Sequence, residues 1–368
     1  MPNPLIFISA GDPSGDIASG RLLVALRERR SNIDCFGLGG LCLASLGQEQ
    51  LAGGHDLAVM GFWEVARRFR YFQKLMHRTV DEITSRKPKL IVLVDYPGFN
   101  LRLAARVKHL GIPIVYYIAP QVWAWGKGRI SQLRQLVNRM LVILPFEERF
   151  FRDHGVPAEF VGHYLVEDID ARMIGTSPKG NGVLALLPGS RHQEIDRMLV
   201  PMIQAARLFN DRYGTRAVVA GVKGAYDYDS SLRAHGDDRI TVQYGNSRQV
   251  IYESDLVVTA SGTATLETGI IGRPMVIVYK TGYITYQIAR CVVRLDKIGL
   301  ANLVLDEKAV PELIQGDVTP ERIFQELSAY RQSGELCSAV QKKLSSLPQK
   351  LGGSGASGRA AAIIEQYL

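Results

Sequence analysis

The feature that most constrains the fold of this chain is a series of short apolar segments that alternate with helix-like segments, twice over. Short apolar runs bounded by turn residues are typical of buried strands, whereas longer runs with a 3.6-residue period are typical of helices. Strands separated by helices form parallel sheets covered on both faces, so the pattern predicts an α/β protein with two Rossmann-like, doubly wound domains. The expected strands are 5–9, 33–37, 90–95, 112–118, 140–144, 158–161, 183–187, 216–220, 239–243, 256–260 and 274–279.

The polar stretch MIGTSPKGNG at 173–182 is expected to be the hinge between the two domains. We therefore predict an N-terminal domain over 1–172 and a C-terminal domain over 173–344, with the terminal helices, 345–368, packing back on the first. In such folds ligands bind at the carboxyl ends of the strands. The sequence thus predicts a cleft between the two domains, lined by the segments that follow the strands.

The composition, 46% hydrophobic and 22% charged in 368 residues, is typical of a folded soluble protein. A net charge of +8 is compatible with binding to nucleic acid, but the basic residues form no long block or recognition motif that would support such binding. Anionic lipids or phosphorylated substrates attract the same charge. Four cysteines without a CxxC pair, and no apolar stretch long enough to span a bilayer, predict a cytoplasmic protein with free thiols.

The stretch LALLPGSRHQEI, 184–195, predicts a strand, a turn at Gly189 and Ser190, and a helix that starts near Arg191. The free N–H groups of a helix N-terminus favour an anion, and a guanidinium adds a planar fork that matches phosphate oxygens. A surface arginine in a tight turn is the alternative for this motif alone.

A second strand, turn and helix follow in TASGTATLETG, 259–269. The successive N–H groups of Ser261, Gly262 and Thr263 are predicted to cradle a phosphate, and Glu267 to accept hydrogen bonds from ribose hydroxyls. With the preceding motif, this predicts a site for a nucleoside diphosphate whose β-phosphate leaves.

Two carboxylates follow strands of the first half. Asp95 ends a wholly apolar strand in VDYPGFN, where partial desolvation favours a general base that titrates near neutral pH. Asp12 and Asp16 lie in SAGDPSGDIASG, where they could hold a sugar hydroxyl. For Asp95 the alternative is a cap on the following turn, and for the second motif it is a helix N-terminus capped by Ser14 or Asp16.

Aromatic residues mark two further segments. Trp123 and Trp125 follow a strand in YYIAPQVWAWGKGRI, where aromatic faces suit a phosphorylated sugar, although buried tryptophans more often serve packing.

In VMGFWEVARRFRYFQKLMHR, 59–78, apolar residues at helical spacing interleave with basic ones. This favours an interfacial helix on an anionic bilayer, and a core-facing helix with a basic outer side is the equal alternative. The candidates for acceptor contact and membrane docking are Met60, Phe62, Trp63, Phe69, Phe72, Trp123 and Trp125.

Taken in order, the motifs resemble those of the lipid-A-disaccharide synthase family across nearly the whole chain. They are SAGDPSGD, AVMGFWEV, DYPGFN, APQVWAW, LPFEERFF, VGH, LLPGSR, SGTATLE and PMVIVYK. The resemblance implies a metal-independent, inverting glycosyltransferase of the GT-B arrangement. It implies UDP-2,3-diacylglucosamine as donor and 2,3-diacylglucosamine 1-phosphate as acceptor, which are joined by a β-1,6 bond at the inner face of the inner membrane of Gram-negative bacteria, with UDP released.

The resemblance also implies roles for particular residues. Asp95 corresponds to the essential aspartate of the family and Asp12 to a second acidic position, so both are predicted to be catalytic. Arg191 is also predicted to be catalytic, facing the UDP diphosphate, and Asn302 corresponds to an asparagine of the donor site. No cofactor or metal is expected, and the two Asp-x-Asp runs, at 168–170 and 227–229, are not expected to bind one. The resemblance is compatible with a homodimer.

Two other functions stay open at the level of sequence. One is another GT-B enzyme that acts on UDP-N-acetylglucosamine, an epimerase or a peptidoglycan glycosyltransferase. The other is a non-catalytic protein that binds nucleic acid or membranes through its positive charge.

Overall fold

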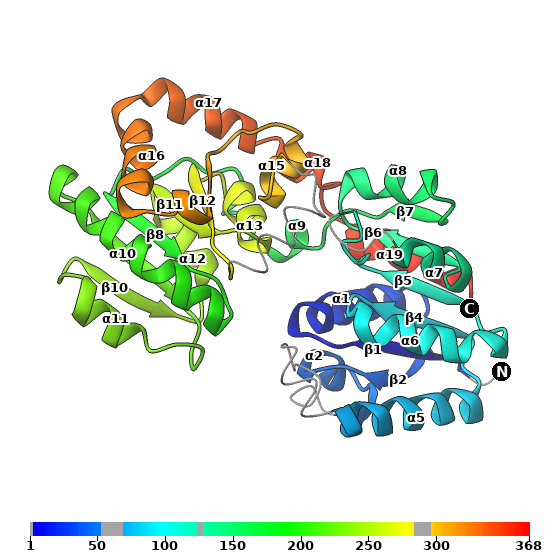
Figure 1. Cartoon of the computed structure of the whole chain (residues 1–368). Coiled ribbons are helices and arrows are strands. Elements are labelled where there is room, and N and C mark those ends of the chain that lie inside the picture. Colours follow the sequence, from blue (N-terminus) through cyan, green and yellow to red (C-terminus); the bar gives the residue numbers. More distant parts are fainter. Residues whose placement is uncertain (1–2, 53–68, 124–127, 283–295) are drawn as a thin grey trace. The chain divides into compact units, whose positions relative to one another are not determined.

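The computed structural model describes residues 3–52, 69–123, 128–282 and 296–368, and its contacts divide the chain into two compact units (Figure 1). Unit 1 comprises 1–164 and 352–368, and unit 2 comprises 165–351. Of the predicted docking residues, Met60, Phe62, Trp63 and Trp125 lie outside the described residues.

Unit 1 is an α/β domain built on a seven-stranded parallel sheet in the order β3-β2-β1-β4-β5-β6-β7. Its strands are β1 (Leu5–Ala10), β2 (Asp34–Leu38), β3 (Glu49–Ala52), β4 (Leu90–Val94), β5 (Ile114–Tyr117), β6 (Arg139–Val142) and β7 (Ala158–Phe160). Its helices are α1 (Pro13–Arg29), α2 (Leu41–Ser45), α5 (Phe69–Arg86), α6 (Pro97–Val107), the 3-10 turn η1 (Lys108–Leu110), α7 (Arg129–Leu136), α8 (Pro145–Asp153) and α19 (Ala356–Glu365).

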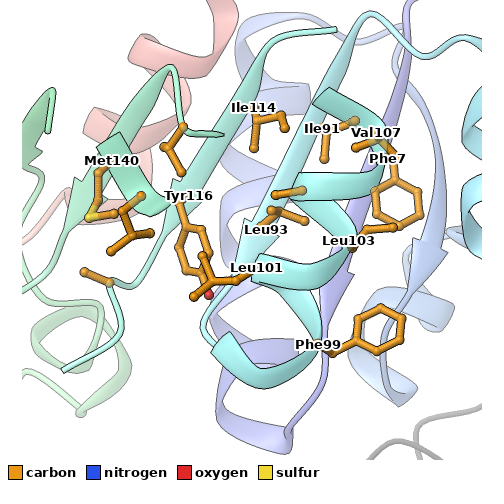
Figure 2. Packing of buried hydrophobic residues seen from close by; sticks show 14 of the residues in the cluster. Phe7, Ile91, Leu93, Phe99, Leu101, Leu103, Val107, Ile114, Tyr116 and Met140 are labelled. Carbon is orange, nitrogen blue, oxygen red and sulfur yellow. The ribbon is translucent and has the colours of Figure 1, made fainter. Parts of the chain in front are cut away.

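The core of unit 1 lies between the sheet and its helices. Figure 2 shows Leu101 of α6 beside Tyr116 of β5 and Leu103 of α6 beside Phe7 of β1, with Leu93 of β4 between them. These side chains are buried, and β4 is apolar at every position because helices cover both of its faces. A central strand of this kind places the residue after it, Asp95, at the edge of a rigid layer.

Unit 2 repeats the architecture with a six-stranded parallel sheet in the order β10-β9-β8-β11-β12-β13. Its strands are β8 (Val183–Leu187), β9 (Arg216–Gly221), β10 (Ile240–Tyr244), β11 (Leu256–Ala260), β12 (Met275–Tyr279) and β13 (Glu312–Ile314). Its helices are α9 (Leu165–Asp168), α10 (His192–Tyr213), α11 (Tyr228–His235), α12 (Ser247–Glu253), α13 (Thr263–Ile271), α15 (Leu300–Leu305), the 3-10 turn η2 (Gln315–Asp317), α16 (Pro320–Gln332), α17 (Gly334–Leu344) and α18 (Leu347–Lys350).

Each sheet has one point where the strand order reverses. In unit 1 it lies between β1 and β4, whose ends Ala10 and Val94 are partners, and in unit 2 between β8 and β11, where Leu187 pairs with Thr259. Connections leave these neighbouring strands in opposite directions, so their carboxyl ends stay open, and ligands of doubly wound folds bind there. The four polar motifs of the sequence follow these four strands.

The α/β prediction with two doubly wound sheets is confirmed, and all eleven predicted strands are present with ends shifted by a few residues. The sequence missed β3 and β13, which are short edge strands with one buried leucine each and no continuous apolar run.

The contacts divide the chain at Tyr164/Leu165 and Leu351/Gly352 rather than at 172/173 and 344/345. The stretch predicted as a hinge is bound to unit 2: Gly175 donates to the Ile270 carbonyl, and the Asp255 carboxylate accepts from Gly180 and Gly182. At the other end of the chain, α19 packs on α1, and Arg29 pairs with Glu365 at 2.8 Å.

The largest fully buried side chain, Arg273, also fastens this stretch. Its guanidinium donates to the carbonyls of Thr176, Ile271 and Tyr252, the last at 2.7 Å. Burial lowers the pKa of this arginine. The group therefore supplies hydrogen bonds to main-chain carbonyls that would otherwise be buried without partners.

Replacing Arg273 by lysine is expected to lower the thermal midpoint of the protein, because one ammonium cannot reach all three carbonyls. The expected loss in unfolding free energy is about 2–4 kcal/mol. Calorimetry with the exposed Arg322→Lys as control measures it, and equal midpoints for both variants would contradict the assigned role.

Candidate active site

The carboxyl ends of β1 and β4 bring Asp12 and Asp95 to the same edge of unit 1. The Tyr96 ring lies directly over Gly11: a Cβ at position 11 would be 2.2 Å from the Tyr96 Cδ1 atom. Glycine is therefore required there by this close approach. The two carboxylates are near enough for Asp12 to raise the pKa of Asp95.

The backbone at Asp95 is held in an unusual conformation. Asp95 and Tyr96 have φ of 43° and 47°, in the left-handed region that side chains other than those of glycine, asparagine and aspartate rarely adopt. Buried Asn100 stabilises this turn, because its amide donates to the Asp95 carbonyl at 2.9 Å and its oxygen accepts from Ser9 at 2.7 Å. The Tyr116 hydroxyl donates to the same Asp95 carbonyl at 2.5 Å. Strained backbone held by buried hydrogen bonds is a feature of functional sites.

The electrostatic environment of Asp95 suits a proton acceptor. Its pKa is raised to about 6, mainly by burial and also by the nearby Asp12, while a hydrogen bond from the Tyr96 backbone acts to lower it. A carboxylate of this pKa is ionised at neutral pH yet basic enough to take a proton in a transition state.

The two acidic residues of the first motif have different structural roles. Asp12 caps α1 by accepting from the Gly15 amide at 3.2 Å and also accepts from the Ser14 hydroxyl. The expectation that Asp16 holds a sugar hydroxyl is not supported, because its buried carboxylate accepts from the amides of Gly40, Cys42 and Leu43. The cap of α1 is therefore Asp12, rather than the Ser14 or Asp16 of the alternative interpretation.

Trp123 is fixed by a buried glutamate that the sequence reasoning did not single out. Its indole N–H donates to Glu147 Oε1 at 2.9 Å, and its ring packs edge-on against Phe146 at 5.0 Å. The pKa of Glu147 is raised to about 7 because burial outweighs the hydrogen bonds from Trp123 and the Leu144 amide, which lower it. The Glu147 side chain reaches back to the Leu144 amide at the start of α8, as the glutamate of a capping box does, and the pattern LPFE, a proline followed by Glu, is the signal that could have found it.

The described part of the aromatic segment, 69–78, fits the core-facing alternative. Phe72 is half-buried against the core of unit 1, together with Tyr71, and Leu75 and Met76 are buried in it. The opposite side of α5 is basic and exposed, with Arg70, Lys74 and Arg78. Phe69 begins α5, and its side chain is outside the described set.

In unit 2, the turn after β8 has the predicted form. Gly189 has φ of 111°, which favours glycine, and a Cβ there would lie 2.8 Å from Glu194 Oε2, so the glutamate side chain would have to shift. Ser190 is exposed, and Arg191 is the N-cap of α10. The exposed Arg191 guanidinium pairs with Glu194 at 2.9 Å, so an incoming anion would compete with this carboxylate.

The turn after β11 leads into α13. Gly262, with φ of 148°, has open space where a Cβ would point, and Thr263 is the first helical residue. Ser261 donates its hydroxyl to the Ile298 carbonyl at 2.9 Å, while its amide donates to Val278. The Ser261 amide is thus used by the sheet, and the Gly262 and Thr263 amides are the ones that begin the helix and suit an anion.

Glu267 lies one turn into α13 and is paired with an arginine that sequence reasoning missed. The Arg248 Nε donates to Glu267 Oε1 at 2.8 Å, and the same guanidinium pairs with the Asp168 carboxylate. Only the tertiary structure brings α9, α12 and α13 together at this point.

Asn302, predicted in the donor site, is fully buried and bonded within the protein. Its amide donates to the Val310 carbonyl and to Glu312 at 2.9 and 2.8 Å, and its oxygen accepts from the Val310 amide. Glu312 in turn accepts from the amides of Ile298 and Gly299. This geometry gives Asn302 a role in holding the 298–299 loop, and a direct bond to the donor would require these contacts to break.

The Asp-x-Asp runs are explained by neighbouring side chains. Asp168 pairs with Arg248, Asp170 with Arg172, and Asp227 caps α11. In the described ranges, no group of three or more His, Cys, Asp or Glu residues is arranged to hold a metal ion.

Comparison with known sequences decides the family. The family model described as lipid-A-disaccharide synthetase matches residues 6–364. The chain is 40% identical over 375 residues to the lipid-A-disaccharide synthase of Myxococcus xanthus, covering 99% of this chain and 98% of the relative. Its identity to the enzyme of Syntrophus aciditrophicus is 39%, over 99% and 97% of the two chains.

The chain belongs to the lipid-A-disaccharide synthase family.

Solved structures with low identity agree on the fold of this family member. A putative UDP-N-acetylglucosamine 2-epimerase from Listeria monocytogenes matches with a TM-score of 0.67 and 12% identity, over 99% and 95% of the two chains. The calicheamicin glycosyltransferase matches with a TM-score of 0.62 and 16% identity, over 100% and 99%. Both likenesses agree with the α/β fold of two doubly wound sheets that is predicted from sequence.

The environment of Asp95 predicts how this family member responds to pH. Its pKa is raised from 3.8 to about 6 in the folded state, so the folded protein binds this proton more tightly than the unfolded chain. The ionised carboxylate therefore destabilises the fold, and the loss develops as pH rises from about 4 to about 6.

Replacing Asp95 by asparagine is expected to stabilise the protein by roughly 2 kcal/mol at neutral pH and not at pH 4. Asparagine tolerates the left-handed backbone, so the substitution removes the charge without adding strain. Thermal midpoints of both proteins across this pH range measure the effect, and a gain that does not change with pH would contradict it.

Proposed function

We propose that this chain transfers the 2,3-diacylglucosaminyl group of UDP-2,3-diacylglucosamine to the 6-hydroxyl of 2,3-diacylglucosamine 1-phosphate, with release of UDP. Membership of the lipid-A-disaccharide synthase family supports this assignment. The observation that carries the chemistry is the half-buried Asp95 carboxylate, whose pKa is about 6 and which follows β4 at the point where the strand order of unit 1 reverses, called here its switch point. The product is a lipid A disaccharide with a β-1,6 bond.

In the proposed reaction Asp95 acts as the general base. The acceptor 6-hydroxyl oxygen attacks the anomeric carbon of the donor as the bond from that carbon to the UDP oxygen breaks, which inverts the configuration. The hydroxyl proton passes to Asp95. Asp12, on the adjacent strand end, makes Asp95 more basic, which is the catalytic role we assign to it.

Unit 2 is proposed to bind the donor. Arg191 and the first amides of α10 and α13 would receive the diphosphate and stabilise the charge that develops on departing UDP. Gly189 and Ser190 shape the first turn, Ser261, Gly262 and Thr263 the second, and Glu267 would accept from the ribose hydroxyls. The open space at Gly262 supports close approach of a phosphate to the backbone.

We propose that the enzyme works at the anionic inner face of the inner membrane. Its substrates carry acyl chains, each buried methylene of which contributes about 0.8 kcal/mol to membrane binding, so they stay in the bilayer. In the described part of the chain no helix is long and apolar enough to cross a membrane. The exposed basic side of α5 supports electrostatic attraction to anionic lipids. Met60, Phe62, Trp63 and Phe69 are proposed to add apolar contacts, and Trp123 and Trp125 to contact the acceptor.

Replacing Arg191 by alanine is expected to lower kcat by on the order of 10²-fold, because the developing charge on UDP loses a donor. The exposed position of Arg191 predicts an unchanged fold. Turnover with purified lipid substrates measures the effect, and Arg233→Ala, on α11, is the control. Near-normal turnover would contradict the diphosphate role.

Asparagine at position 95 is expected to abolish transfer while UDP still binds, because the base is lost and the donor unit is untouched. The wild-type rate is expected to fall as pH drops through about 6, where Asp95 becomes protonated. Mass spectrometry of the disaccharide 1-phosphate and calorimetry with UDP separate the two effects. Turnover of UDP-N-acetylglucosamine without any disaccharide would instead indicate the epimerase type of activity.

A further inference from the structure

Arg248 contacts the residue to which we assign ribose recognition. It lies in the first turn of α12, its side chain is 26% exposed, and the two carboxylates that it joins, Asp168 and Glu267, are each 14% exposed. Figure 1 shows α12 and α13 side by side in unit 2, and their contacts agree. A largely desolvated arginine with two acidic partners is strongly oriented, since ion pairs of this kind are screened little by water.

The planar guanidinium uses separate edges for separate partners. Its Nε donates to Glu267 Oε1 at 2.8 Å, its Nη1 to the Asp168 carbonyl at 2.9 Å, and its Nη2 pairs with the Asp168 carboxylate. α9 thus holds one edge of the plane and leaves the Nε edge for Glu267. Because the group is planar, fixing one edge fixes the direction of the other.

The charges around Glu267 leave its carboxylate able to accept further hydrogen bonds. Asp168 balances the positive charge of Arg248, so the cluster of three side chains retains one net negative charge. Arg248 contacts one carboxylate oxygen of Glu267, and a carboxylate has two oxygens with several lone-pair sites. A held, negatively charged acceptor next to the N-terminal turn of α13 matches a pair of neighbouring hydroxyls.

We propose that Arg248 is a positioning residue that aims the Glu267 carboxylate at the ribose hydroxyls of the donor nucleotide, with Asp168 as its anchor. The inference rests on the proposed function, because it requires a UDP donor in unit 2. It predicts that Arg248 determines how strongly the protein prefers a nucleotide with a ribose over one that lacks the 2′- and 3′-hydroxyls.

The test compares the binding of UDP and of 2′,3′-dideoxy-UDP to the full chain by calorimetry. The wild type is expected to prefer UDP by roughly tenfold or more, since charge-assisted hydrogen bonds are lost with the hydroxyls. Arg248→Lys is expected to reduce this preference to within about twofold, because an ammonium cannot make the three directed contacts. Glu267→Gln should lower it similarly, and the double variant should be no worse than Glu267→Gln alone.

A matched control is available in the same unit. Arg239 also joins two carboxylates, those of Asp211 and Asp237, but it precedes β10, at the opposite end of the strands from the proposed donor site. Arg239→Lys should leave the preference for UDP unchanged. Asp168→Asn is a milder variant should Arg248→Lys fail to fold: it keeps the carbonyl contact and should give an intermediate preference.

Three results decide the outcome. A reduced preference in Arg248→Lys with normal preference in Arg239→Lys supports the inference. Weaker binding of both nucleotides with an unchanged preference would overturn it, because Arg248 would then only support the fold. A wild type that binds neither nucleotide would overturn the proposed donor site itself.

Discussion

The structure depends on the way parallel strands are connected. A crossover between parallel strands is almost always right-handed, so a sheet that grows from its centre in both directions must have one pair of neighbouring strands whose connections diverge. In this protein those pairs are β1 with β4 and β8 with β11. The backbone beyond their carboxyl ends is left uncovered by crossover helices, and the residues there are free to serve chemistry rather than packing.

The residue at the switch point of unit 1, Asp95, destabilises the fold, and buried hydrogen bonds offset part of this effect. Asp95 combines an ionisable group in a half-buried place with a left-handed backbone, and both are unfavourable for the fold. Buried Asn100 offsets part of this by bonding to Ser9 and to the carbonyls around Asp95, and Tyr116 adds another bond. Asn100 of DYPGFN therefore stabilises the backbone conformation of Asp95, which lies five residues before it.

In unit 2, the charged residues of the proposed site form ion pairs with one another or with their neighbours. Its proposed ligand-binding residues are already paired, Arg191 with Glu194 and Glu267 with Arg248. The first pair is exposed, so it contributes little to stability and an anion can replace the carboxylate. The second is largely desolvated and anchored through Asp168, so it is suited to hold an orientation. The same two residue types thus have opposite roles because their exposure differs.

The sequence by itself determined most strands of the two sheets, because apolar strands such as 5–9, 90–95, 183–187 and 256–260 are local patterns. It also predicted a candidate site at the ends of these four strands, because the polar and glycine-rich turns that follow them are local patterns too. It also identified the family through the order of its motifs. It could not find β3 and β13, because edge strands need little apolar burial. It also could not show that the side chains of Asp16 and Asn302 form hydrogen bonds within the protein that hold its loops. The pairing of Arg248 with Asp168 and Glu267, and of Trp123 with Glu147, joins residues 19 to 80 positions apart. Only the tertiary structure decided these contacts, because they depend on how helices pack on a sheet and not on any neighbour along the chain.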